Sequence, residues 1–126
     1  MYFYRLIFCG WQAALAGCVL VLAACSGPSA EPDATAIAHA QQAVPADPSM
    51  AALYERSCRT CHSHVEAKAP LTGFAPHWSP RLKQGMPVLL AHVRDGYLGM
   101  PARGYCNDCS DRDFEALIRF MSAQQP

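Results

Sequence analysis

The chain is 126 residues long and carries ten basic and ten acidic side chains, which gives a formal net charge of zero at pH 7. No basic stripe is present, and this argues against nucleic acid as a partner. There is no internal repeat either, which excludes a solenoid or another repeat architecture.

Residues 1–24 have the pattern of a secretory signal. A short head containing Arg5 precedes an almost uncharged apolar run that ends at Ala24. A charged head, an apolar core and small residues at the end are typical of such signals. The last four residues, Leu22-Ala23-Ala24-Cys25, resemble a bacterial lipobox, in which the cysteine becomes the acylated first residue of the mature chain. We therefore predict a lipoprotein signal peptide over 1–24 and lipid at Cys25.

Two alternatives exist for this segment. Leu15-Ala16-Gly17-Cys18 also fits a lipobox, but cleavage there would leave the apolar run 19–22 exposed, so we favour Cys25. The apolar run is also about long enough to remain as an uncleaved membrane anchor. Both interpretations tether the protein on the periplasmic side of a bacterial membrane, in an oxidising compartment. Ser26 after the cysteine favours the outer membrane.

Residues 25–46 are predicted to be a lipidated flexible tether. They are rich in Ala, Pro, Ser, Gln and Asp, and their only large apolar residues are Ile37 and Val44, so they cannot bury a core. The stretch 34–43 is at most transiently helical. The folded domain is then 47–126, about 80 residues, which is marginal for hydrophobic burial alone.

Three amphipathic helices are predicted in the domain. The first covers 49–58, with apolar residues at i, i+3 and i+4, and the second covers 88–95. The last follows Ser110, which forms a variant capping box with Asp113, and its apolar positions are 114, 117, 118 and 121. Four prolines and two glycines between 70 and 87 predict an ordered loop there. No strand pattern is present, so the fold class is all-α.

The segment Cys58-Arg59-Thr60-Cys61-His62 is a C-x-x-C-H motif, the attachment signature of c-type haem. On a helix, Cys58, Cys61 and His62 share one face. Two thiols there can each add to a vinyl group of one porphyrin, while the imidazole reaches the iron as the proximal ligand. The motif predicts one covalent haem c, which would also supply apolar surface that a short domain lacks.

Met100, in a Met-Pro dipeptide just after the glycines at 96 and 99, is the predicted second axial ligand. A thioether would close the coordination of the iron and raise its reduction potential relative to two histidines. Met86, His77 and His92 remain alternatives at this stage.

Cys106 and Cys109 form a second close pair. In an exported protein a disulfide between them is the expected state. The two C-x-x-C pairs together also suggest a zinc site, but the 44 residues between them far exceed the usual spacing, and zinc gives no role to His62 or Met100. A thioredoxin-type redox pair is disfavoured because no βαβ pattern is present.

The stretch from Met100 to Asp111 resembles cytochrome c5, within the class I c-type cytochromes, because a Met-Pro loop precedes Gly-x-Cys-x-x-Cys-Ser-Asp. Tyr54, four residues before Cys58, and the apolar C-terminal helix also fit, and the resemblance covers residues 51–124. It implies a small all-α cytochrome c fold of about three to five helices around one haem, with the first and last helices crossing.

The resemblance also implies roles for three further residues. The carbonyl of Pro70 would accept the imidazole N–H of His62, and Trp78 and Arg81 would lie near a haem propionate. The run after His62 departs from the family pattern because it lacks the usual glycine, which leaves the path of that loop open.

We therefore predict a membrane-tethered monohaem cytochrome, not an enzyme, that carries single electrons between a donor and an acceptor protein. No small-molecule substrate is expected, since the haem performs the chemistry. A peroxidase-type enzyme is one alternative and would need an open sixth site, with His77 or His92 as the acid–base group. A zinc-binding structural module is the other.

Overall fold

The computed structural model describes residues 31–123. The predicted signal peptide, Cys18, Cys25 and the first residues of the tether lie outside the described residues, as do 124–126. Within 31–123 the chain forms helices and no strand, apart from one isolated bridge between Tyr97 and Met100. The predicted all-α class is confirmed. No helix in this part of the chain is long and apolar enough to span a membrane.

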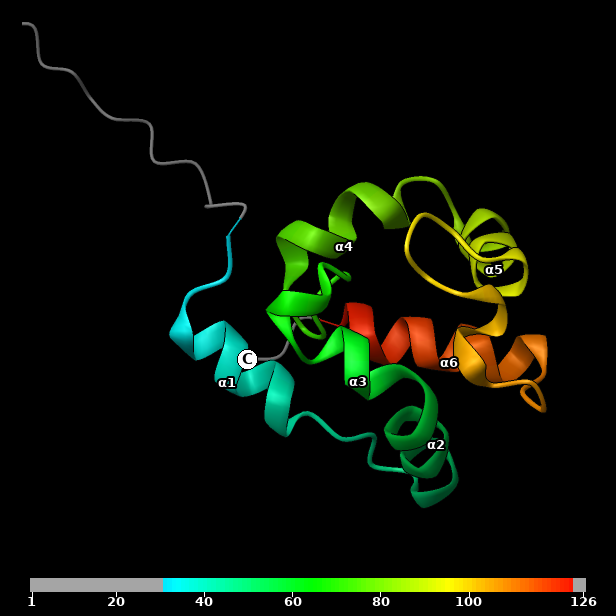
Figure 1. Ribbon diagram of the computed structural model, residues 1–126, viewed down its shortest axis with the longest axis horizontal. Coiled ribbons are helices and arrows are strands. Elements are labelled where there is room, and N and C mark those ends of the chain that lie inside the picture. Colours follow the sequence, from blue (N-terminus) through cyan, green and yellow to red (C-terminus); the bar gives the residue numbers. More distant parts are fainter. Residues whose placement is uncertain (1–30, 124–126) are drawn as a thin grey trace, which may run out of the picture.

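Six α-helices and three short turns of other helical pitch follow one another between residues 31 and 123. They are α1 (Ala34–Gln42), α2 (Pro48–Leu53), the π-helical η1 (Tyr54–Cys58), α3 (Arg59–His62), the 3₁₀ turn η2 (Val65–Ala67), α4 (Ala75–Leu82), α5 (Met86–Asp95), the 3₁₀ turn η3 (Ala102–Tyr105) and α6 (Asp111–Ser122). In Figure 1, α4 and α5 lie above α6 and α2 lies below it, and all three contact α6.

The predicted first helix is one continuous run, α2–η1–α3, that extends through His62. Asp47 begins it by accepting a hydrogen bond from the Met50 backbone N–H at 2.8 Å, and Pro48 occupies the first turn, where no N–H is needed. The π-helical turn η1 lies directly before the cysteine motif; such turns are frequent at functional sites. The run therefore delivers the whole motif on one helical segment.

The predicted C-terminal helix is α6. Ser110 accepts a hydrogen bond from the Asp113 backbone N–H at 3.3 Å, and the Asp113 carboxylate accepts one from the Ser110 N–H at 2.8 Å. This reciprocal pair is the predicted capping box. The apolar face of α6 is buried in the main core, where it meets Tyr54, Trp78 and Leu89; its members are Phe114, Leu117, Ile118 and Met121.

The prediction of a loop over 70–87 is wrong for residues 75–82, which form α4. Pro76 lies in the first turn, where a missing N–H costs nothing. Pro80 lies inside the helix, where it cannot donate a backbone hydrogen bond, and Trp78 on the same helix is buried in the core. The helix predicted over 88–95 begins earlier, at Met86, because Pro87 is likewise accepted in a first turn.

The prediction of a flexible tether over 25–46 is wrong for residues 34–42, which form α1. Asp33 caps this helix by accepting a hydrogen bond from the Ala36 N–H at 2.8 Å. Ala40 has no exposed surface, so α1 packs against the rest of the molecule. Composition is a poor guide here because alanine has the highest helix propensity and buries its small side chain without a large apolar residue.

Candidate functional site

One cavity of about 400 Å³ is bounded by α3, α4, α5 and the loop that leads to η3. Its volume lies within the range of small-molecule and cofactor pockets. Eight of the candidate site residues from the sequence line this cavity together with apolar side chains of α5 and α6: Cys58, Cys61, His62, Pro70, Trp78, Arg81, His92 and Met100. The fold thus gathers residues that are up to 42 positions apart.

His62 is buried at the end of α3, and its Nδ1 lies 2.8 Å from the carbonyl oxygen of Pro70. Burial lowers the pKa of His62; the Pro70 hydrogen bond opposes this, and the nearby charge of Arg81 adds to it. The ring is therefore neutral, with Nδ1–H donating to Pro70. Nε2 remains as the nitrogen that can bind a metal, the arrangement typical of metal-ligating histidines.

Cys58 and Cys61 are free thiols in the part of the chain that the structure describes, in contrast to the pair at 106 and 109. Burial, with a smaller contribution from neighbouring Cys61, raises the pKa of the Cys58 thiol to about 11. Both thiols line the cavity beside His62. The donor set thus fits a haem c: two thiols for the thioether bonds and one imidazole for the iron.

Met100 ends a tight turn in which Tyr97 and Met100 exchange backbone hydrogen bonds of 3.0 and 2.9 Å. Its side chain lines the cavity and passes close to Gly104, where a Cβ atom would lie only 3.1 Å from the Met100 methyl carbon. Gly104 also has a φ of +53°, which disfavours any other residue. Two separate constraints thus make position 104 a glycine that accommodates Met100.

The three alternative ligands are placed differently. Met86 packs against the main core and does not line the cavity. His77 also lies outside it, and its Nδ1 accepts the Leu71 backbone N–H at 3.1 Å. His92 does line the cavity, with its ring stacked 3.8 Å from that of Tyr97.

Trp78 and Arg81, which the family resemblance places near a propionate, both line the cavity. The indole N–H of Trp78 donates to the Leu71 carbonyl at 2.8 Å, and its ring stacks 5.9 Å from that of His62. The guanidinium of Arg81 donates to the carbonyl of His77, on the preceding turn of α4. Trp78 therefore packs against the His62 ring and is itself fixed by its hydrogen bond to Leu71, in the segment before α4.

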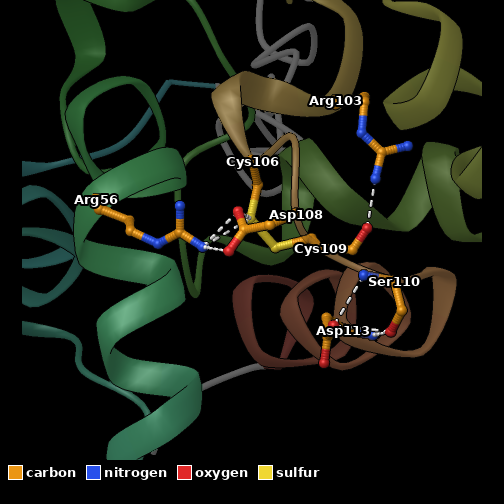
Figure 2. A network of polar contacts seen from close by, with 7 residues as sticks. All are labelled: Arg56, Arg103, Cys106, Asp108, Cys109, Ser110 and Asp113. Carbon is orange, nitrogen blue, oxygen red and sulfur yellow. Dashed lines mark hydrogen bonds and ion pairs between the residues drawn. A yellow bond between two sulfur atoms is a disulfide. The ribbon is translucent and has the colours of Figure 1, made fainter.

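Cys106 and Cys109 are joined by a disulfide, and both are buried. This bond uses two of the four thiols that the zinc alternative requires. Figure 2 shows how the disulfide loop is held: Arg56 in η1 binds the Asp108 carboxylate at 2.8 Å and lies 3.4 Å from the Cys106 sulfur. The Arg56 hydrogen bond holds the pKa of Asp108 below its usual range.

The opposite side of the loop is held by Arg103, which donates to the Cys109 carbonyl (Figure 2). The Arg103 guanidinium also lies over the Phe114 ring, 5.1 Å from its centroid. The disulfide loop thus connects the helix before Cys58 to the chain just after Met100. The sequence interpretation missed this connection and the role of Gly104. A glycine four residues after the candidate ligand was the available signal for the latter.

Comparison with known proteins identifies the family. A family model described as cytochrome C oxidase, cbb3-type, subunit III matches residues 45–121, more than half of the chain. The chain belongs to this family of c-type cytochromes. Cytochrome c5 of Azotobacter vinelandii is 39% identical over 67 residues, which cover 52% of this chain and 81% of that protein. The predicted resemblance to cytochrome c5 is confirmed.

Two further relatives agree. Cytochrome c-555 of Chlorobaculum tepidum is 35% identical over 77 residues, covering 58% of this chain and 71% of the relative. A chain in the crystal structure of an electron transfer complex of nitrite reductase with cytochrome c is 36% identical, with a TM-score of 0.53. That match covers 60% of this chain and 93% of the other. The protein is a monohaem c-type cytochrome and an electron carrier, and its cofactor is one covalent haem c.

Proposed function

We propose that this cytochrome is tethered to a bacterial membrane and passes single electrons between a donor and an acceptor protein outside the cytoplasm. In this proposal Cys58 and Cys61 would hold the haem through thioether bonds, and His62 and Met100 would bind its iron. The observation that supports the haem site, and with it the electron-carrier role, is that His62 and Met100 line one cavity with both cysteines.

The chain's own residues prepare the site for electron transfer. The hydrogen bond from His62 to Pro70 holds the ring in place and raises the basicity of the ligating nitrogen. A thioether from Met100 favours the reduced metal and raises the potential. When bound, the haem supplies the one-electron chemistry; Pro70, Trp78 and Arg81 surround it, and the apolar cavity wall limits its access to water.

Redox proteins are the proposed partners. This is supported by the likeness to a chain from a complex of nitrite reductase with cytochrome c. With His62 and Met100 both bound to the iron, no position would be left for a substrate, and the haem would supply electron transfer to a partner protein without binding a substrate.

The proposed tether is lipid on Cys25, which lies outside the described residues and is supported by the lipobox pattern. Ser26 supports the outer membrane as destination, facing the periplasm. Intact mass of the native protein should show a chain that starts at Cys25 and carries acyl groups. A soluble mature chain, or one that starts at Cys18, would contradict this part of the proposal.

The test of the haem site uses purified holoprotein. Haem should stay with the chain after acid–acetone treatment, and the oxidised protein should show the weak long-wavelength band of a sulfur-to-iron bond. Met100→Ala should abolish that band, lower the reduction potential and open the iron to added ligands. Met86→Ala is the matched control and should change none of these properties, because Met86 does not line the cavity.

Three results would contradict parts of this proposal. Rapid binding of carbon monoxide or cyanide by the wild type, together with turnover of peroxide, would show an open sixth site and favour a peroxidase-type enzyme. Freely extractable haem, or stoichiometric zinc in place of haem, would contradict the covalent attachment itself.

A further inference from the structure

Helix α1 lies outside the part of the chain that matches the family model, because it precedes residues 45–121. It is nevertheless packed against the cytochrome domain. Ala40 has no exposed surface, and Ala43 just after the helix is 8% exposed. A helix that only passed through solvent would leave these alanines partly accessible, so α1 is docked.

The docking contact reaches the haem-attachment motif itself. Arg59, between Cys58 and Cys61, donates from Nη2 to the Gln41 carbonyl at 2.6 Å. The Gln41 carbonyl is in the last turn of α1, where carbonyl groups have no hydrogen-bond donor within the helix. The negative end of the helix dipole also lies there, and it favours a positive charge such as that of Arg59. The Nη1 atom of Arg59 binds the Glu55 carboxylate at 2.7 Å, so the guanidinium is held in position for α1.

A shared hollow supports the same placement. Ile37 of α1 lines it together with Val65 of η2 and Ala69, so α1 lies beside the turn that follows His62. In Figure 1, α1 is at the left of the domain, whereas α5 and the loop that ends at Met100 are at the right. The docked helix and the Met100 side of the haem cavity are therefore on opposite sides of the domain.

We propose that α1 is a clamp that shortens the membrane tether and turns the Met100 side of the domain away from the lipid. The proposal rests on the lipid attachment at Cys25 proposed above. Ala34 is nine residue steps after Cys25, so the start of docked α1 lies within about 32 Å of the anchor whatever the conformation between them. With α1 detached and unfolded, the 22 residue steps from Cys25 to Asp47 would allow up to about 79 Å.

The consequence concerns access to partners. The chain on either side of Met100 presents Leu98 and Tyr105, two residues that are 87% and 71% exposed. Large apolar side chains so exposed at a cavity mouth suit contact with another protein. The clamp keeps this surface away from the membrane. A soluble redox partner can then reach it.

The first experiment measures docking in the lipidated holoprotein by hydrogen–deuterium exchange of peptides that cover 34–43. Arg59→Ala removes the charged hydrogen bond to α1, and Arg119→Ala is the matched control, since Arg119 binds Glu115 in the same i, i+4 geometry but on α6. We expect Arg59→Ala to accelerate exchange over 34–43 by roughly tenfold or more. Arg119→Ala should leave those peptides unchanged.

Ala40→Glu is a second route to the same state, because it places a carboxylate at a fully buried position of α1. Ala40→Glu does not change the haem-attachment motif. Faster exchange in this variant therefore cannot result from a defect in haem attachment, which Arg59→Ala could cause. Haem content is measured on each variant. Unprotected 34–43 peptides in the wild type, or no acceleration in either variant, would overturn the clamp.

The second experiment measures reach, with the haem as quencher of a headgroup fluorophore in phosphatidylethanolamine–phosphatidylglycerol vesicles. Wild type and Arg119→Ala should quench equally, and Arg59→Ala and Ala40→Glu should quench at least about twofold less, since the haem can move away. Equal quenching in variants that have lost protection would overturn the spacer role. A wild type that does not bind vesicles would instead refute the lipid anchor, while the exchange data would still report on docking.

Discussion

Gly104→Ala tests the fit between the chain and its proposed distal ligand. A Cβ at position 104 would lie 3.1 Å from the Met100 methyl carbon, whereas carbon atoms in contact are normally about 3.5–4.0 Å apart. The methyl group must therefore move by about 0.5 Å. Because it ends a flexible side chain, the domain can still fold, and the displacement falls on the thioether that faces the cavity.

The backbone adds a second cost. Gly104 has a φ of +53°, and an alanine in this region loses about 1–2 kcal/mol relative to glycine. For a domain of this size each kcal/mol lowers the melting temperature by roughly 4–8 °C. We therefore expect a melting temperature lower by on the order of 5–15 °C, together with a weaker sulfur-to-iron band and a lower reduction potential.

Gly99→Ala is the control because it changes the same loop without either cost. A Cβ at position 99 meets no atom within 4 Å, and Gly99 has no positive φ. The assay is thermal unfolding of both holoproteins, followed by their near-infrared spectra and redox titrations. If Gly104→Ala matches Gly99→Ala in stability and in the sulfur-to-iron band, the proposed packing of Met100 against Gly104 is wrong.

Three further outcomes follow from the geometry. The hydroxyl groups of Tyr54 and Thr72 are buried and form a hydrogen bond of 3.0 Å. Tyr54→Phe or Thr72→Val should each lower the free energy of unfolding, measured in urea, by about 1–3 kcal/mol, because each leaves the other hydroxyl buried without this partner. The double variant should lose less than the sum, and additive losses would contradict the pairing. Trp78→Phe should leave the Leu71 carbonyl without its donor, with a loss of about 1–3 kcal/mol in the same assay; an unchanged midpoint would refute this. The capping hydrogen bonds hold the pKa of Asp113 below its ordinary value of 3.8, so its contribution is present above about pH 4 and is lost as the pH falls through the lowered value. Asp113→Asn should therefore be less stable than wild type at neutral pH and approach it in acid; a gap that is constant with pH would show that the carboxylate has no such role.

The parts of the site that the sequence predicted are those set by neighbouring positions. The spacing of Cys58, Cys61 and His62 predicts a shared helical face because helix geometry is regular over five residues. The capping box at the start of α6 and the apolar face that follows are local in the same sense, and both are present. The helix α4 was missed because a count of prolines does not distinguish a proline in a first turn from one that breaks a helix.

The sequence by itself determined the haem-attachment motif, the cysteine pair at 106 and 109 and the all-α class, because these depend on residue types at short spacings. The tertiary structure decided that Met100 lines the cavity while Met86 and His77 do not, since that depends on where distant turns cross the domain. It also decided the docking of α1, because the contact between Arg59 and Gln41 joins residues 18 positions apart and no local pattern marks it. Helical periodicity is a property of each segment alone, whereas a cavity and a docked helix exist only when several segments pack together.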